Sequence, residues 1–208
     1  MVQVTHCGDN TIKINTIICA AQKRFGLYGL EKTTMSEIAR DVGISKASLY
    51  YYFPDKEHLY KKVIENEQEA FFELIEKNIK ETSEPEKMIR KFMAIRLNYF
   101  RTFFNLSRLR LEDFRHMKPV IEDVLADFRK KEIASLEIIL KQGVDTGLFF
   151  CENTYESSSL FLEMVRGVRS LLFHNKDLMY VEQEDYDMLL DKMNKITNIF
   201  IKSLKIKE

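Results

Sequence analysis

The sequence predicts an all-α fold. Apolar residues recur at a period close to 3.6 over long stretches, which is the pattern of amphipathic helices. The 208 residues include only 7 glycines and 3 prolines, too few turn-forming residues for a fold of many short strands. Hydrophobic residues make up 45% of the chain, which is enough to build a core. We therefore expect an all-α architecture of about nine helices.

The composition argues against a secreted, membrane or metal-binding protein. The opening residues, MVQVTHCGDN, lack a basic segment followed by an apolar one. No stretch reaches the roughly 18 uncharged apolar residues of a membrane span. Three cysteines without CxxC spacing and four histidines that do not pair at ligand spacing favour neither disulfides nor a metal site. We expect a cytoplasmic protein with no membrane association, metal or cofactor.

Local start and stop signals predict the first three helices. A helix over residues 11–25 is followed by GLYGLEK, in which two glycines favour a turn. A second helix begins after Thr34, because TMSE has the spacing of a capping box, and it ends at Gly43. A third helix begins at Ser45, a good N-cap, and Pro54 ends it.

Six further helices are predicted along the rest of the chain. Asp55 caps the first of them. Pro85 and Pro119 each fall in the first turn of a helix, the position where proline is best tolerated. Gly147 ends the helix that follows Pro119. The expected ranges are 56–80, 84–104, 107–116, 119–145, 154–173 and 182–205.

Residues 35–54 have the spacing of a helix-turn-helix. Ala39 is small where the second helix crosses closely, and Gly43, four residues later, turns the chain. Two short helices joined by a glycine also occur in helical proteins that never touch DNA. An outward Lys46 and a net charge of +4 over residues 10–62, from nine basic and five acidic residues, favour DNA. The residues expected to face inward are Ile38, Val42, Ile44, Leu49 and Tyr52.

The second helix of this motif is expected to enter the major groove with its N-terminal residues at the base edges. Lys46 is a donor for guanine or for phosphate, and Ala47 is small enough to meet a thymine methyl group. Ser48, Tyr50 and Tyr51 carry hydroxyls that suit phosphate oxygens. These five residues are the main candidate DNA contacts.

Helix N-termini bind anions, so two further candidates lie at the starts of neighbouring helices. They are Thr34, before the first helix of the motif, and Lys56, after Pro54. Tyr52 is expected to turn its ring towards the core and to keep its hydroxyl near the surface. The motif thus predicts a DNA-binding domain over residues 1–60 and a second domain over residues 61–208, joined within a helix.

The run FGLYGLEKTTMSEIARDVGISKASLYYYFPDKEHLY resembles the N-terminal signature of the tetracycline-repressor (TetR, AcrR-like) family of one-component transcription regulators. The resemblance covers about residues 14–64, and TT, IA-x-x-x-G-I-S-K, LYYYF and K-E-x-L all fall in register. Met35 departs from it, since family members often have a polar residue there that reaches DNA. That contact is either missing here or replaced by Ser36. The resemblance implies that the DNA side is lined by Thr34, Lys46, Ala47, Ser48, Tyr50, Tyr51, Tyr52 and Lys56.

The resemblance also implies a small-molecule pocket in the second domain. Arg96 lies within an apolar stripe, where a charge is costly unless it is paired. It is either an internal ion pair or snorkelling side chain, or a pocket arginine for an anionic or polar effector. Aromatic residues at helical spacing are more often plain core than pocket lining. The candidate effector-binding residues are Phe92, Arg96, Tyr99, Phe103, Phe128, Glu163 and Arg166.

The last two helices are implied to form a four-helix dimer interface with their copies. The alternative is that their apolar stripes face the body of the same chain. The stripe over 154–173 comprises Phe161, Met164, Val165, Val168, Leu171 and Leu172, and the stripe over 182–205 comprises Leu189, Met193, Ile196, Phe200 and Leu204. The candidate interface residues are Phe161, Val165, Val168, Leu172, Leu189, Met193, Ile196 and Phe200.

Together these features predict a homodimeric, ligand-responsive transcriptional regulator, expected to be a repressor, that binds a palindromic double-stranded operator. An alternative is a DNA-binding dimer with no small-molecule effector, acting structurally or through a protein partner. An enzyme is not expected, because the chain has no HExxH, no Gly-rich phosphate loop and no nucleophile elbow.

Overall fold

A computed structural model describes residues 9–107, 111–173 and 183–206 of the chain. These residues form eight α-helices, and their only strand-like feature is one isolated antiparallel bridge between Phe149 and Lys205. The predicted all-α fold is confirmed. The helices are α1 (Asp9–Tyr28), α2 (Met35–Val42), α3 (Lys46–Tyr52), α4 (Lys56–Glu81), α5 (Pro85–Ser107), α6 (Leu111–Asp145), α7 (Thr154–Phe173) and α8 (Gln183–Leu204).

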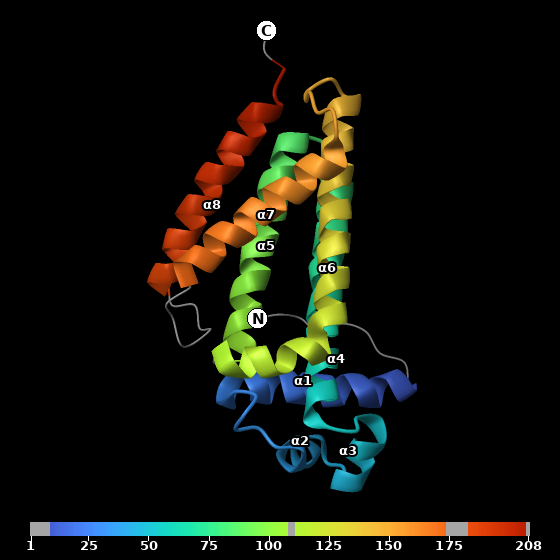
Figure 1. The fold of residues 1–208 in the computed structure, drawn as a ribbon. Coiled ribbons are helices and arrows are strands. Elements are labelled where there is room, and N and C mark those ends of the chain that lie inside the picture. The colour runs from blue at the N-terminus through green and yellow to red at the C-terminus, as the bar shows by residue number, and fades with distance from the viewer. Residues whose placement is uncertain (1–8, 108–110, 174–182, 207–208) are drawn as a thin grey trace.

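The helices divide the molecule into a small end and a long body. Helices α1, α2 and α3 lie together at one end, and α4 leaves α3 and rises into the body (Figure 1). There it packs beside α5 and α6, while α7 and α8 cover the other side of α5 and α6. In the described part of the chain no helix is long and apolar enough to cross a membrane.

The count of eight corrects the prediction of nine, because α6 does not break before Pro119. Proline removes a backbone hydrogen bond and costs about 3 kcal/mol in a helix interior. Met117 and Ile121 on either side of Pro119 are both buried, at 6% and 0% exposure. Their packing against the small end offsets the lost hydrogen bond, so the helix continues through the proline.

Helix α1 also runs further than predicted. It continues through Gly26 to Tyr28, and the turn falls on Gly29, whose φ is +85°. Only the second glycine of GLYGLEK therefore carries the positive φ that ends the helix.

Two hydrophobic cores form, one in each part of the molecule, and both use α4. The lower core joins α1, α2 and α3 to the first turns of α4 and includes Ile64. Met117, Ile121 and Val124 of α6 also belong to it. The upper core begins on α4 at Phe71 and is completed by α5 to α8. The division into domains at residues 60 and 61 remains a prediction, since α4 and α6 contribute to both cores.

Candidate nucleic-acid interface

Backbone caps set the geometry of α2 and α3. Thr34 closes the predicted capping box: its Oγ1 accepts from the amide of Glu37 at 3.3 Å, and its own amide donates to Glu37 Oε2 at 2.9 Å. Ser45 caps α3 by accepting from the amide of Ser48 at 3.0 Å. Between them Gly43 has a φ of +72°, and the Ile44 amide donates to the carbonyl of Ala39 at 3.0 Å. The turn angle between the two helices therefore depends on local chemistry.

A charge cluster braces α2 against α1. The Arg24 guanidinium donates to both carboxylate oxygens of Asp41, with Nη2 to Oδ1 at 2.8 Å, and lies 3.4 Å from Glu37. This hydrogen bond lowers the pKa of Asp41, and the hydrogen bonds from Thr34 lower the pKa of Glu37. Both carboxylates are therefore ionised at neutral pH and hold α2 in place beneath α1.

Helix α3 has one fully buried anchor and an exposed outer face. Leu49 is 0% exposed in the lower core. Tyr51 projects furthest, at 85% exposure, and the ammonium of Lys46 lies 5.7 Å from the centre of the Tyr50 ring. This cation–π contact joins the two side chains along the exposed face. All five main candidates, Lys46, Ala47, Ser48, Tyr50 and Tyr51, are exposed.

Tyr52 follows its predicted position. It is half-buried and packs against the lower core, and its ring meets the Tyr51 ring edge-on at 5.3 Å. Met35 is buried at 6% exposure, so its side chain does not reach outward. Ser36, the next residue of α2, is exposed.

Two candidates at helix N-termini already have intramolecular partners. The Thr34 hydroxyl is used in the capping box, although the residue is exposed. The ammonium of Lys56 donates to the carbonyl oxygens of Leu30 at 2.8 Å and of Glu31 at 3.3 Å. Lys56 therefore fastens the α1–α2 connection to the start of α4.

The candidate effector residues of the body form a packed aromatic cluster and a buried charge cluster. Phe92 is fully buried. The Tyr99 ring stacks on Phe128 at 5.1 Å, and both rings contact Phe71. Glu163 is exposed and accepts from Ser159 instead. The side chain of Phe103 lies outside the described residues.

Arg96 is part of a buried ion pair. Its guanidinium contacts Glu132, which is 1% exposed, and Arg166 Nη1 lies 3.6 Å from the other oxygen of the same carboxylate. Burial lowers the pKa of Arg166, and burial together with the charge of Arg96 lowers the pKa of Arg169 to about 10. Arg166 and Arg169 nevertheless keep their charge at neutral pH. Of the two interpretations of Arg96, the geometry matches the internal ion pair.

The candidate dimer residues lie mostly inside the chain's own core. Phe161, Val165, Leu189 and Met193 are each at most 1% exposed. The remaining four, Val168, Leu172, Ile196 and Phe200, are partly buried and pack against the upper core, with the Phe200 ring stacked on Phe161 at 4.1 Å. The inward stripe thus corresponds to the alternative in which α7 and α8 face the body.

A different set of residues forms the outer apolar surface of these two helices. Leu160, Met164 and Leu171 of α7 are 65%, 42% and 80% exposed. Met188 and Ile199 of α8 are 51% and 67% exposed. On α7 these residues lie at positions i, i+4 and i+11, and Gly167 occupies position i+7 of the same helix face. Nothing lies within 4 Å of a Cβ placed on Gly167. We call these five residues the outer stripe.

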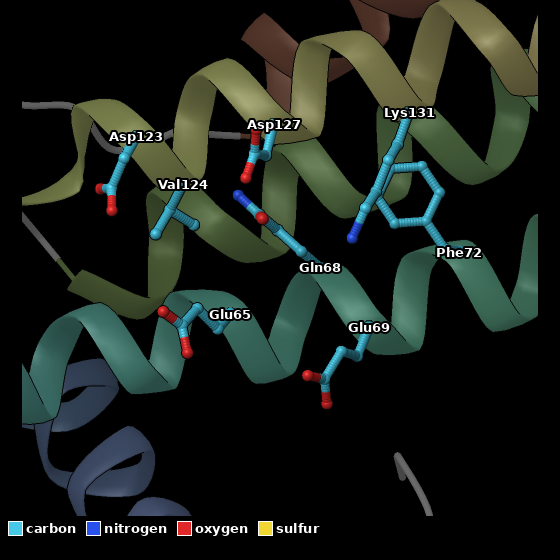
Figure 2. Close-up of a pocket in the computed structure, with 8 residues that line it drawn as sticks. All are labelled: Glu65, Gln68, Glu69, Phe72, Asp123, Val124, Asp127 and Lys131. Atoms are coloured by element: carbon cyan, nitrogen blue, oxygen red, sulfur yellow. The ribbon is translucent and has the colours of Figure 1, made fainter.

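A pocket of about 260 Å³ lies between α4 and α6, in a place that the sequence interpretation missed. Figure 2 shows four carboxylates around it, two from each helix, with Gln68 reaching from α4 towards α6. The signal was present as acidic residues at helical spacing on α4, but such a pattern is usual for a solvated helix face. The lining residues are Glu65, Gln68, Glu69, Phe72, Asp123, Val124, Asp127 and Lys131.

The capped helix pair, its exposed basic and tyrosine face and the helical body define a DNA-binding transcriptional regulator of the helix-turn-helix class. The profile described as "Bacterial regulatory proteins, tetR family" matches residues 17–63. The solved structure of a transcriptional regulator from Cytophaga hutchinsonii is 39% identical, covers 93% of this chain and 99% of its own, and superimposes with a TM-score of 0.87. The chain belongs to the tetR family of bacterial regulatory proteins.

Two curated relatives match over shorter regions. The HTH-type transcriptional regulator RutR of Escherichia coli K12 is 28% identical over 135 residues, which are 65% of this chain and 63% of RutR. The chain thus spans less than two thirds of that relative. The biofilm operon icaADBC negative transcriptional regulator IcaR of Staphylococcus epidermidis is 39% identical over 62 residues, 30% of this chain and 34% of IcaR.

Proposed function

We propose that the protein is a ligand-responsive transcriptional repressor that binds a palindromic operator as a homodimer. The observation that carries the proposal is the outer face of α3, where five exposed side chains surround one fully buried leucine. A short helix anchored in this way offers its face to a groove without losing its own packing.

Each exposed residue of α3 has a proposed role at the operator. Lys46 donates to guanine or to a phosphate, and Ala47 meets a thymine methyl group. Ser48, Tyr50 and Tyr51 hold phosphate oxygens and so set the register of the helix. The cation–π contact between Lys46 and Tyr50 limits the rotamers of both side chains before DNA arrives.

Thr34, Ser36, Tyr52 and Lys56 have supporting roles in the proposal. In the proposal, the amides at the start of α2, beside Thr34, face the phosphate backbone of the DNA. Ser36 offers an exposed hydroxyl next to the buried Met35. Tyr52 positions Tyr51 through the edge-on ring contact. Lys56 holds the connection at Leu30 and Glu31, and its charge at the start of α4 favours a nearby phosphate.

Homodimerisation is proposed through the outer stripe. An exposed apolar surface on two adjacent helices favours association with a like surface, and a two-fold axis pairs it with itself. Gly167 lets the backbone of the second copy approach closely. Two α3 helices related by this axis read the two halves of a palindrome, one DNA turn apart.

Repression and its release complete the proposal. A dimer bound at a promoter blocks transcription, and the relative IcaR is a negative transcriptional regulator. An effector releases the operator only if it binds one conformation of the protein better than the other. Because α4 runs from α3 into the upper core, a change in the body that tilts α4 moves α3.

The test is selection of operator fragments from genomic DNA, followed by fluorescence anisotropy on the selected sequence. Lys46→Ala and Tyr51→Ala are expected to weaken binding by at least about tenfold each while folding is retained. The matched control is Lys80→Ala, an exposed lysine at the far end of α4. Unchanged affinity in both α3 variants overturns the assignment of α3 as the reading helix.

Dimerisation is tested separately by light scattering on the purified protein. Leu160→Glu combined with Leu171→Glu is expected to give a monomer, because two charges then lie in the outer stripe. Glu163→Gln serves as the control on the same helix. A dimer that survives the double substitution places the interface elsewhere. If no ligand panel stabilises the protein, the alternative of a DNA-binding dimer without an effector replaces the ligand-responsive repressor.

A further inference from the structure

We propose that the pocket between α4 and α6 is the effector site and that it takes a small organic cation. The ammonium group would lie among the four carboxylates, and the apolar part would lie against Phe72 and Val124. This proposal rests on the proposed function, since it names the chemistry and the place of the effector that the repressor responds to.

The electrostatics of the pocket favour a positive ligand. Each of the two helices contributes two carboxylates to the pocket: Glu65 and Glu69 from α4, and Asp123 and Asp127 from α6 (Figure 2). A single ammonium, that of Lys131, lines the pocket with them. Four carboxylates in one pocket repel an anion and attract a cation over a distance set by the ionic strength.

Three lysines outside the pocket lining pair with these carboxylates. Lys61 pairs with Asp123 at 2.6 Å and Lys62 with Glu65 at 2.8 Å. The Asp127 partner, Lys130, is 3.7 Å away and its side chain is 80% exposed. The Lys130–Asp127 pair is exposed on both sides and contributes little, so a ligand ammonium can exchange with Lys130.

Glu69 has no ion pair within the described ranges, which leaves one carboxylate of the pocket open to a ligand.

The side chain of Lys131 already places a cation against an aromatic ring of this pocket. Its ammonium lies 5.9 Å from the centre of the Phe72 ring, and it makes no ion pair with any residue that the structure describes. The face of Phe72 is therefore already used as a cation-binding surface. Lys131 therefore lies over the ring that the apolar part of a ligand would cover, and a ligand has to displace it.

Gln68 supplies the second, independent sign of a ligand. It is 7% exposed, it lines the pocket, and its Nε2 has no hydrogen-bond acceptor among the described atoms. A buried donor without an acceptor is unfavourable, and a ligand oxygen or nitrogen lone pair would satisfy it.

The arrangement suits an organic cation better than a metal ion. Calcium and magnesium need six or more oxygens converging within about 2.6 Å of one point. Among the described residues no group of three acidic, histidine or cysteine side chains is placed to hold a metal ion. Carboxylates on opposite walls of a 260 Å³ pocket instead fit a molecule that spans them.

The pocket lies at the junction of the two hydrophobic cores, where a bound ligand can affect the position of the DNA-binding helices. On α4, Gln68 falls between Ile64 of the lower core and Phe71 of the upper core. On α6, Val124 belongs to the lower core. A ligand that bridges α4 and α6 at this junction changes the angle at which α4 carries α3, and this is the differential interaction that coupling requires.

The experiment uses the full-length protein with benzylamine and 1,4-diaminobutane as probes. Benzyl alcohol, 1,4-butanediol and benzoate are the neutral and anionic controls, and magnesium chloride is the metal control. Calorimetry measures binding without DNA, and anisotropy measures operator affinity. At least one amine is expected to bind and to weaken operator binding, while the controls do neither.

Substitutions locate the site. Glu69→Gln and Asp127→Asn are expected to weaken amine binding by at least about tenfold. Lys131→Met is expected to tighten it several-fold, because the internal competitor is removed while the stem length is kept. Glu73→Gln, one turn further along α4 and outside the pocket, is the matched control and is expected to bind as the unsubstituted protein does.

Four outcomes overturn the proposal: no amine binding, equal binding of benzoate or magnesium, binding that is insensitive to Glu69→Gln and Asp127→Asn, or binding that leaves operator affinity unchanged. Failure of the repressor assignment gives a different result. In that case no operator fragment is selected at all, while calorimetry still reports whether the pocket binds an amine.

Discussion

The helix-turn-helix end and the body are both built from amphipathic helices, yet they are held together by different kinds of interaction. In addition to its hydrophobic core, the small end relies on caps, a glycine turn and the Arg24–Asp41 contact, which join residues no more than 17 positions apart in the sequence. The body relies on long apolar stripes and on a buried ion pair between helices α5 and α6. Local chemistry thus sets the geometry of the reading surface, whereas packing sets the geometry of the sensing body.

The largest expected effect tests the body. Replacing Glu132 with alanine leaves Arg96 and Arg166 without their shared carboxylate. Removing one partner of a buried pair costs about 3–5 kcal/mol, so the free energy of unfolding in urea should fall by that amount. Glu163→Ala, on the exposed side of α7, should change it by less than about 0.5 kcal/mol. Equal losses in the two variants would mean that the ion pair does not hold the body together.

The next effect separates stability from recognition within α3. Leu49→Ala removes the buried anchor and should lower the free energy of unfolding by about 2–5 kcal/mol. Tyr51→Ala removes a side chain that is 85% exposed and should change it by less than about 0.5 kcal/mol. The comparison fails if Tyr51→Ala destabilises the protein as much as Leu49→Ala, because Tyr51 would then be a packing residue.

A smaller effect is expected at the turn. Gly43 has a φ of +72°, and nothing lies within 4 Å of a Cβ placed there. Gly43→Ala should therefore cost only the left-handed backbone penalty, about 1–2 kcal/mol in thermal unfolding. Gly43→Asn should recover part of the loss, since asparagine adopts this conformation more readily. A loss in the asparagine variant as large as in the alanine variant would point to a steric cause instead.

The smallest effect concerns pH. The pKa of Asp41 is lowered because Arg24 donates to its carboxylate. A lowered folded-state pKa adds stability that is complete above the unfolded pKa of about 3.9 and is lost as the pH falls through the folded value. The difference in Tm between the unsubstituted protein and Asp41→Asn should therefore be constant above about pH 5 and shrink below pH 4. A difference that persists unchanged at pH 2 would show that the contact does not depend on the charge of Asp41.

The sequence interpretation was most successful where neighbouring residues decide the structure. The capping box at Thr34, the αL glycine at position 43 and the Ser45 cap all lie where the local pattern placed them. Tyr52 turns to the core because Leu49, three residues earlier, is already anchored there. These features need no information from distant parts of the chain.

Other features escaped the sequence interpretation because distant residues decide them. Pro119 is a helix breaker by its own chemistry, but Met117 and Ile121 pack against the small end and keep α6 continuous. The contact of the Lys56 ammonium with the carbonyls of residues 30 and 31 joins positions 25 and 26 residues apart. No local pattern records either contact.

By itself, the sequence determined the helical class, the start and end of α2 and α3, and the family, because caps, glycine turns and period-3.6 stripes act over a few residues. Only the tertiary structure decided which side of α7 and α8 turns inward, that Arg96 meets Glu132, and that acidic faces of α4 and α6 enclose one pocket. An apolar or acidic stripe specifies that a helix has two faces, but the face that is buried depends on which other helix packs against it.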